Sequence, residues 1–303
     1  MFKSIWDDIV YQFKQGSMVT RLISICVVVF LLFETLHFIL WSGGNEVLFY
    51  HIDHLFALPS SFLIFLTQPW SAITFMFMHA DVWHIFYNML WLYWFGEIYQ
   101  LYMRNRRMLP IFVFGSLTGG ALIMVLSYII PPLRATIDVS YTVGASAGIF
   151  AIVFAATALN PDHRINLLLI GPVPIKYIAV VSFVLSYVAI THGNAAGEIS
   201  HIGGAIFGFA YIKSLQSGVD WFTPLDKVAG LFRPKSKLKA TYVNSGRNKK
   251  DEPSDNEQKR VDAILDKIAK SGYNSLTKEK RTSCLSSVIN RKQPVKGFKP
   301  LTG

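Results

Sequence analysis

Three short stretches of the sequence carry polar side chains of types that could act together in hydrolysis. They contain His84 and Asn88, then Gly144, Ser146 and Gly148, and then His201, Gly204 and Gly208. A serine hydroxyl becomes a nucleophile when an imidazole accepts its proton, and N–H donors can bind the oxyanion that forms. The residue types therefore predict acyl transfer, with Ser146 as nucleophile and His201 as general base.

Each stretch also has a structural interpretation that its residues leave open. His84 and Asn88 are four residues apart and share one helix face, where a helix–helix hydrogen bond is the alternative to a functional pair. Small residues around Ser146 are typical of closely packed membrane helices. For His201, beside Gly204, the alternative is a histidine that only packs against a neighbouring helix. The chemical interpretation requires all three stretches to meet in space.

Six apolar segments have about the length that crosses a hydrocarbon core, roughly 20 helical residues. They are Val19–Trp41, Trp83–Tyr102, Leu109–Ile130, Thr142–Leu159, Ile175–Ile190 and Ile199–Ile212. The last two are short, so we expect them in the interior of the bundle rather than facing lipid. The sequence predicts an all-α membrane protein with a bundle of six transmembrane helices.

Lys and Arg residues are concentrated in alternate connections between these segments. They are Lys3, Lys14, Arg21, Arg104, Arg106, Arg107, Arg164, Lys176 and Lys213, whereas the other connections hold only Arg134. The positive-inside tendency then predicts that both termini are cytoplasmic. Segments two, four and six would all run inward, which puts the candidate polar residues at one depth, with Ser146 about one turn inside its helix.

The composition excludes a single ordinary soluble domain, because 52% of residues are apolar and only 16% are charged. The formal net charge of +10 comes mainly from the part after Tyr211. Beside a membrane, a basic tail is expected either to contact anionic lipid headgroups or simply to set the topology, and we expect no nucleic acid partner. Cys26 and Cys284 imply no disulfide framework, and no cleavable signal peptide is predicted.

Two connections on the external side could bear on the site. The long one, Ser42–Asp81, contains the apolar run Leu55–Leu66, which predicts a structured element partly in the outer interface; a buried loop or a failed span is the alternative. The short one, His192–Gly197, is either a flexible cap over His201 or a plain turn. No third catalytic acid is expected, because the acidic residues lie at segment ends, in loops or in the tail.

In combination, the three stretches resemble the rhomboid family of intramembrane serine proteases, over about Val19 to Tyr211. The family's marks are a Gly-x-Ser-Gly serine, a later Ala-His-x-Gly-Gly helix and an earlier His-x-x-x-Asn. The resemblance implies that Ser146 and His201 are the catalytic pair and that His84 and Asn88 stabilise the oxyanion. It also implies that Gly144, Gly148, Gly204 and Gly208 pack helices around the site, and that the membrane is a bacterial inner membrane.

Trp70 resembles the tryptophan of the family's Trp-Arg motif, and three positions depart from the family pattern. Ala147 stands where Gly is usual, which bears on close packing or oxyanion geometry. Ser200 replaces Ala, a change between small residues. Ser71 replaces the Arg after Trp70, which removes any interaction of that guanidinium. None of these changes removes a reacting group.

The chain is expected to divide into four parts. They are a cytoplasmic segment 1–18, a six-helix domain 19–213, a basic linker 214–257 and a small helical cytoplasmic tail 258–303. In the tail, Val261, Ile264, Leu265 and Ile268 recur at helical spacing, and Thr277 could cap a second short helix bearing Leu285 and Val288. The resemblance extends to such appendages on some bacterial rhomboids.

The function implied is hydrolysis of peptide bonds in or near transmembrane helices of single-span membrane proteins, with no cofactor and no metal. A catalytically silent rhomboid-like protein that binds or traffics client helices is the alternative. A proton-coupled transporter would need acidic residues at mid-membrane depth, and the sequence offers none there.

Overall fold

The computed structural model describes Tyr11, Phe13, 15–103, 105–167, 170–224 and Asp226, with eight further residues between Lys259 and Thr277. The chain divides into two compact units, Met1–Arg233 and Pro234–Gly303. In the second unit, the described residues Lys259, Asp262, Ala263, Asp266 and 268–270 are helical. The second predicted helix of the tail lies outside the described residues, apart from Thr277.

The described part of the first unit is mainly helical, as predicted, and each of the six apolar segments lies on a helix. These helices are α2 (Met18–Ser42), α6 (Val82–Tyr102), α7 (Met108–Ile129), α9 (Ser146–Leu159), α10 (Ile175–Ala189) and α11 (Ala195–Gln216). The arrangement is consistent with the predicted six-helix bundle. Two segments have wrong boundaries. Thr142 lies in a short strand, and the fourth helix begins only at Ser146. The sixth helix, α11, extends four residues beyond the predicted segment at each end.

The connections contain the shorter elements. They are α3 (Glu46–Phe56), β1 (Leu58–Pro59), α4 (Phe62–Thr67), α5 (Ser71–Thr74), η1 (Phe75–Phe77), η2 (Asn105–Arg107), α8 (Pro131–Arg134), β2 (Tyr141–Thr142), β3 (Arg164–Leu167) and β4 (Gly171–Pro174). The long connection before α6 is therefore structured, as predicted, and β1 pairs with β2 in antiparallel register. This pairing ties the long connection to the segment that leads into α9.

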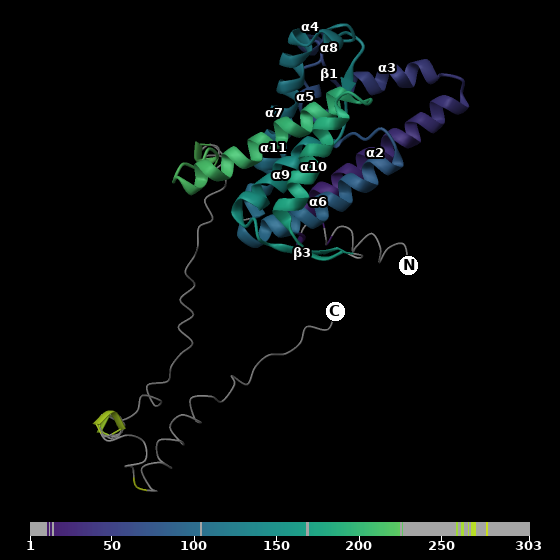
Figure 1. Ribbon diagram of the computed structural model, residues 1–303. Coiled ribbons are helices and arrows are strands. Elements are labelled where there is room, and N and C mark those ends of the chain that lie inside the picture. Colours follow the sequence, from purple (N-terminus) through teal and green to yellow (C-terminus); the bar gives the residue numbers. More distant parts are fainter. Residues whose placement is uncertain are drawn as a thin grey trace, which may run out of the picture. The chain divides into compact units, whose positions relative to one another are not determined.

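Helix α11 packs most extensively against α9 and α7, and these three helices form the centre of the bundle (Figure 1). Glycines make this packing close: a Cβ at Gly204 would collide with the carbonyl oxygen of Ala147, and one at Gly208 with that of Ala151. Without side chains at these positions, the two backbones can approach each other directly. Gly204 and Gly208 therefore allow α11 to lie close against α9.

The predicted interior location is correct for α11 but wrong for α10. Only Ile175, Ala179 and Ser186 of α10 are buried. Its other face exposes large apolar side chains, among them Tyr177, Val180, Val181, Val184, Leu185, Tyr187 and Val188. A short helix need not be central, because length says nothing about which faces have neighbours. Among the described helices, α2 and α7 are long and apolar enough to cross a membrane, and α9 and α10 are shorter apolar helices.

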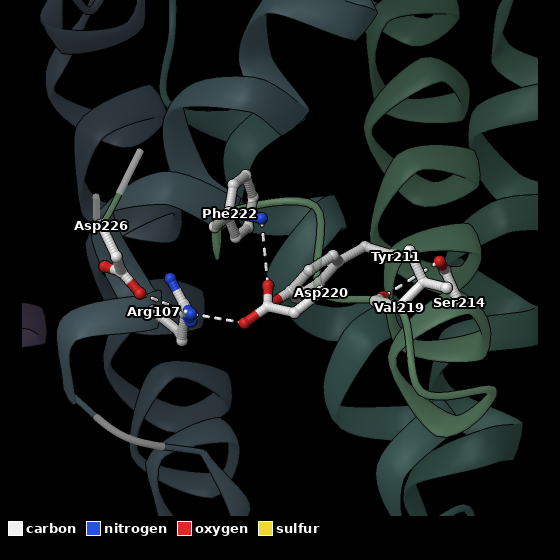
Figure 2. Close-up of polar contacts among 7 residues, drawn as sticks. All are labelled: Arg107, Tyr211, Ser214, Val219, Asp220, Phe222 and Asp226. Carbon is white, nitrogen blue, oxygen red and sulfur yellow. Dashed lines mark hydrogen bonds and ion pairs between the residues drawn. The ribbon is translucent and has the colours of Figure 1, made fainter. Parts of the chain in front are cut away.

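The segment after α11 returns to the start of α7 through an ionic cluster (Figure 2). The Arg107 guanidinium pairs with Asp220 and, at 2.8 Å, with Asp226. Asp220 also accepts hydrogen bonds from the Tyr211 hydroxyl at 3.2 Å and the Phe222 backbone N–H at 3.0 Å. The Arg107 side chain is only 7% exposed, so these carboxylates compensate a nearly buried charge.

Candidate active site

The start of α6 fixes the position and the protonation pattern of His84. The Asp81 side chain accepts hydrogen bonds from the backbone N–H groups of Trp83 (2.8 Å) and His84 (2.9 Å), which caps the helix. The backbone N–H of Ala80 lies 3.3 Å from Nδ1 of His84. Because that N–H can only donate, Nδ1 is the acceptor, and Nε2 carries the proton in the neutral ring.

Nε2 of His84 faces the segment that leads into α9. Gly144 has φ +129°, and a Cβ added there would lie 2.8 Å from Nε2 of His84 and 3.7 Å from Oγ of Ser146. The backbone N–H of Gly144 donates to the Phe75 carbonyl at 2.9 Å. Only glycine both accepts this backbone conformation and leaves room for the imidazole, so Gly144 sits between His84 and Ser146.

Ser146 is the first residue of α9, with Ala145 as its N-cap. The expectation that it lies one turn inside the helix was wrong, because the helix starts four residues later than the apolar run. The first backbone N–H groups of a helix have no partner within it. Ser146 therefore presents its hydroxyl together with an unpaired N–H at the positive end of the helix dipole.

The His201 ring is held by three neighbouring residues, at one face and at Nδ1. Its ring stacks on Phe150 of α9, with centroids 4.4 Å apart and planes at 9°. Its Nδ1 lies 3.0 Å from Oγ of Ser186 on α10 and 3.2 Å from Oε2 of Glu198 on α11. With Nδ1 occupied by these partners, Nε2 is the ring atom left for chemistry.

The contact with Glu198 corrects the expectation that no acid accompanies the histidine. Glu198 lies at the end of its segment, as the sequence indicated, but the i,i+3 spacing on α11 puts its carboxylate on the same helix face as His201. That spacing was the available signal. Ser186 had no comparable signal, because only the packing of α10 on α11 brings it to the ring.

The Asn88 side chain is buried and donates from Nδ2 to the backbone carbonyl of His84 at 2.8 Å. One of its two amide protons is thus used within α6, and the other is available to a further acceptor. The helix also brings His84 close enough to His201 for the two rings to interact electrostatically. Residues of α6, α9 and α11 therefore converge near the first turn of α9.

One contact expected in a resting dyad is not formed. Within the described part of the chain, the Ser146 hydroxyl has no hydrogen-bond partner, and Nδ1 rather than Nε2 of His201 makes the ring's hydrogen bonds. The helices that carry the two residues are nevertheless in direct contact through Gly204 and Ala147. Catalytic hydrogen bonds are commonly long without substrate and tighten in the reacting complex.

His79, which precedes α6, is buried against His84, with ring centroids 5.1 Å apart. By hydrogen-bond geometry, neither of its ring nitrogens has a partner among the described residues, although the Phe77 backbone interacts with the ring. Burial, with a smaller contribution from the charge of His84, lowers the pKa of His79 to about 4. The ring is therefore neutral at physiological pH.

Two other predicted features lie in the long connection and at the turn before α11. Trp70 donates from its indole N–H to the Leu55 carbonyl at 2.8 Å, and the buried Ser71 hydroxyl has no hydrogen-bond partner within the part of the chain that the structure describes. The stretch predicted as a cap or a turn over His201 is only partly a turn, because Ala195 already begins α11 and Asn194 caps it. The described residues contain no group of three or more His, Cys, Asp or Glu side chains that could hold a metal ion.

Comparison with known families matches two parts of the chain. A family model described as the Rhomboid domain matches residues 66–217, about half of the sequence, and a family of unknown function (DUF6576) matches residues 249–283. A comparison with curated proteins finds no match. All three candidate stretches lie inside the first range, and the chain therefore belongs to the rhomboid family of integral membrane proteins, which comprises intramembrane proteases and their inactive relatives.

Proposed function

We propose that this chain is an intramembrane serine endopeptidase in which Ser146 and His201 form the catalytic dyad. The observation that carries the proposal is the contact between His201 and α9. The imidazole stacks on Phe150, one helical turn from Ser146, while its Nδ1 is engaged by Ser186 and Glu198. Nε2 is then the atom that can accept the proton of the serine.

In the proposed reaction, Oγ of Ser146 attacks the substrate carbonyl carbon as its proton passes to Nε2 of His201. The C–N bond then breaks, and Nε2 returns the proton to the leaving amine. Water hydrolyses the acyl-enzyme in a second round with the same proton transfers. A small rotation of the serine side chain or the imidazole must first bring the two together, because they do not share a hydrogen bond before substrate binds.

We expect the oxyanion to be bound by donors from the start of α9 and from α6. They are the backbone N–H of Ser146, the Nε2–H of His84 and the second amide proton of Asn88. The tautomer of His84 supports this role, because the Ala80 N–H contact leaves the proton on Nε2. Donors fixed before the reaction stabilise the developing charge with little reorganisation.

The proposed substrates are single-span membrane proteins cut near the outer end of their helix. A peptide bond in a helix is shielded, so the substrate must unwind locally. We expect a preference for small residues and for helix-weakening Gly or Pro near the cut. The lipid bilayer is the other partner, with anionic headgroups at the basic tail.

For the topology, we propose that both termini are cytoplasmic and that the membrane is a bacterial inner membrane. The distribution of Lys and Arg over alternate connections supports this orientation. It would put the first turn of α9 toward the external side.

The test is labelling of the purified full-length protein in detergent with a fluorophosphonate probe, followed by cleavage of single-span substrates carrying Gly or Pro near the outer end. We expect Ser146→Ala and His201→Ala each to lower cleavage by about 10³-fold or more, because loss of the nucleophile or the base removes the covalent pathway. Ser182→Ala is the matched control, since its hydroxyl only donates to the Ala179 carbonyl within α10.

Three outcomes separate the candidates. Labelling and cleavage that need both Ser146 and His201 support the protease. Cleavage that is equal in wild type and Ser146→Ala removes the assignment. If the wild type is folded and binds single-span helices but neither labels nor cleaves, the chain is the inactive client-binding relative.

A further inference from the structure

Glu198 is an acidic side chain of the site to which the proposed reaction assigns no step. Glu198 and His201 lie on one face of α11, and Ser186 approaches them from α10. A serine–histidine dyad can act without an acid, so this carboxylate needs its own explanation. The inference below rests on the proposed protease function.

The first turn of α11 is built in a way that holds Glu198 in place. Oδ1 of Asn194 accepts a hydrogen bond from the Gly197 N–H at 3.0 Å, and the Asn194 carbonyl accepts one from the Glu198 N–H at 3.1 Å. A Cβ at Gly197 would meet the Asn194 side chain, so glycine allows this cap to close. The glutamate backbone is thereby fixed one turn before His201.

The carboxylate determines which nitrogen of His201 carries the proton. An ionised carboxylate only accepts hydrogen bonds, so the Nδ1 atom 3.2 Å from Oε2 must donate. A neutral imidazole with its proton on Nδ1 has its lone pair on Nε2. Glu198 therefore selects the tautomer that a general base for Ser146 requires.

Ser186 makes this arrangement more specific. Its hydroxyl lies 3.0 Å from Nδ1 of His201 and also interacts with the Glu198 carboxylate. The hydroxyl can donate to the carboxylate while its oxygen shares the Nδ1 proton. Phe150 meanwhile packs on the ring face, so the edge and the face of the imidazole are both restrained.

Burial gives the carboxylate more influence than a surface ion pair would have. The side chains of Glu198 and His201 are 22% and 18% exposed. Charge interactions are stronger where water is largely excluded. When Nε2 takes the serine proton, the imidazolium that forms lies beside a negative charge that is already in place.

We propose that Glu198, assisted by Ser186, is the positioning residue of His201, which makes the site a Ser146–His201–Glu198 triad. Glu198 holds the Nδ1–H tautomer and stabilises the imidazolium, but it does not itself take up the proton. The serine proton moves to Nε2 and from there to the leaving amine. A purely structural role for Glu198, as a negative charge favourable at the N-terminus of α11, is the alternative.

The test compares wild type, Glu198→Gln and Glu198→Asp as folded full-length protein in detergent, with fluorophosphonate labelling as the readout. For Glu198→Gln we expect the maximal labelling rate to fall about 10²-fold, a typical contribution of general acid–base catalysis. The half-saturating probe concentration should stay unchanged. Glu198→Asp, which keeps the charge, should recover part of the rate.

The pH profile of labelling separates positioning from structure. The titratable groups that face His201 are Glu198 from its own helix and His84 from α6. Removing the carboxylate takes away a charge that favours the imidazolium. In Glu198→Gln, the fall of the labelling rate on the acid side of the pH profile (the acidic limb) should therefore occur at lower pH. Glu46→Gln is the matched control, because Glu46 is an exposed acid in the first turn of α3; its profile should equal that of wild type.

Each result decides something. A wild-type rate and acidic limb in Glu198→Gln, while Ser146→Ala does not label, overturns the positioning role and leaves the protease assignment intact. A wild type that neither labels nor cleaves overturns both. If Glu198→Gln yields no folded protein, Glu198→Ala is assayed with added formate: acceleration by this small carboxylate supports the proposal, and an unchanged rate overturns it.

Discussion

The two ends of α11 carry polar clusters that differ in how fully their members are paired. After its C-terminal end, Arg107 is compensated by two carboxylates, and Asp220 is further held by Tyr211 and Phe222. Near its N-terminal end, His201 uses only Nδ1, and the Ser146 hydroxyl has no partner among the described residues.

This difference separates a cluster suited to holding the fold from one suited to reacting. A paired charge that is almost fully buried stabilises one arrangement of the chain and is poorly accessible to a substrate. A half-buried hydroxyl and a free imidazole nitrogen contribute little to stability, yet they are the groups that a substrate can use. Substitutions at the two ends should therefore affect different measurements.

The largest effect on stability is expected at the ionic cluster. Arg107→Met keeps the length of the side chain but leaves Asp220 and Asp226 without their cation. Removing one partner of a buried pair costs about 3 to 5 kcal/mol, and the lower value is expected because the Asp226 side chain is 38% exposed. The measurement is the thermal unfolding midpoint in detergent, together with the labelling rate of the protein that remains folded.

The comparison predicts that the midpoint falls while the labelling rate of folded Arg107→Met equals that of wild type. Arg134→Met, at an exposed position in the last turn of α8, is the control and should leave both unchanged. A lower labelling rate at full folding would mean that the two ends are coupled, and the division between them would fail.

At the reactive end, His79 provides a second effect on stability, and this one depends on pH. Its pKa is lowered from 6.5 to about 4 by burial and by His84. Between these two pH values, His79 binds a proton in the unfolded chain but not in the folded chain. The stability contribution is fully present above pH 6.5 and is lost as pH falls toward 4. The total loss amounts to about 3 kcal/mol.

Thermal unfolding midpoints measured between pH 7 and 4 test this, with His79→Leu as the variant. In this variant, the unfolding midpoint should depend much less on pH in the acidic range, because the imidazole that is protonated on unfolding is absent. His192→Leu, at an exposed position in the turn before α11, is the control and should keep the pH dependence of wild type. A pH dependence of the same size in His79→Leu and wild type would contradict the assignment to His79.

The sequence was sufficient to locate the six helices, because each depends on a local pattern. Apolar runs of membrane-crossing length mark the helices, and the glycine spacing in α11 marks its close packing on α9. The start of α9 was misplaced because Thr142 and Val143 are apolar enough to extend the run, whereas β1–β2 pairing takes the chain into a strand there.

The features that were missed depend on contacts between segments far apart in sequence. Ser186 reaches His201 only through the packing of α10 on α11, and the Arg107 cluster joins the start of α7 to the chain after α11. Arg107 was interpreted only as a topology signal, because a single cation in a connection does not indicate its partner. Glu198 was different: its i,i+3 spacing to His201 was visible, but its position at a segment end hid its importance.

The smallest predicted effect concerns the stacking of Phe150 on His201. Phe150→Leu keeps an apolar side chain in α9 but removes the ring face that lies 4.4 Å from the imidazole. Aromatic pairs contribute about 0.5 to 1.5 kcal/mol beyond their buried area. We therefore expect the fluorophosphonate labelling rate to fall about 2- to 10-fold, with little change in the unfolding midpoint.

Phe154→Leu, one turn further along α9, is the control. It removes a ring that contacts Phe150 and Phe183 rather than His201 and should label at the wild-type rate. Equal losses in the two variants would show that the ring supports the packing of α9 rather than the orientation of the base, and His201 would then depend on Glu198 and Ser186 for its orientation.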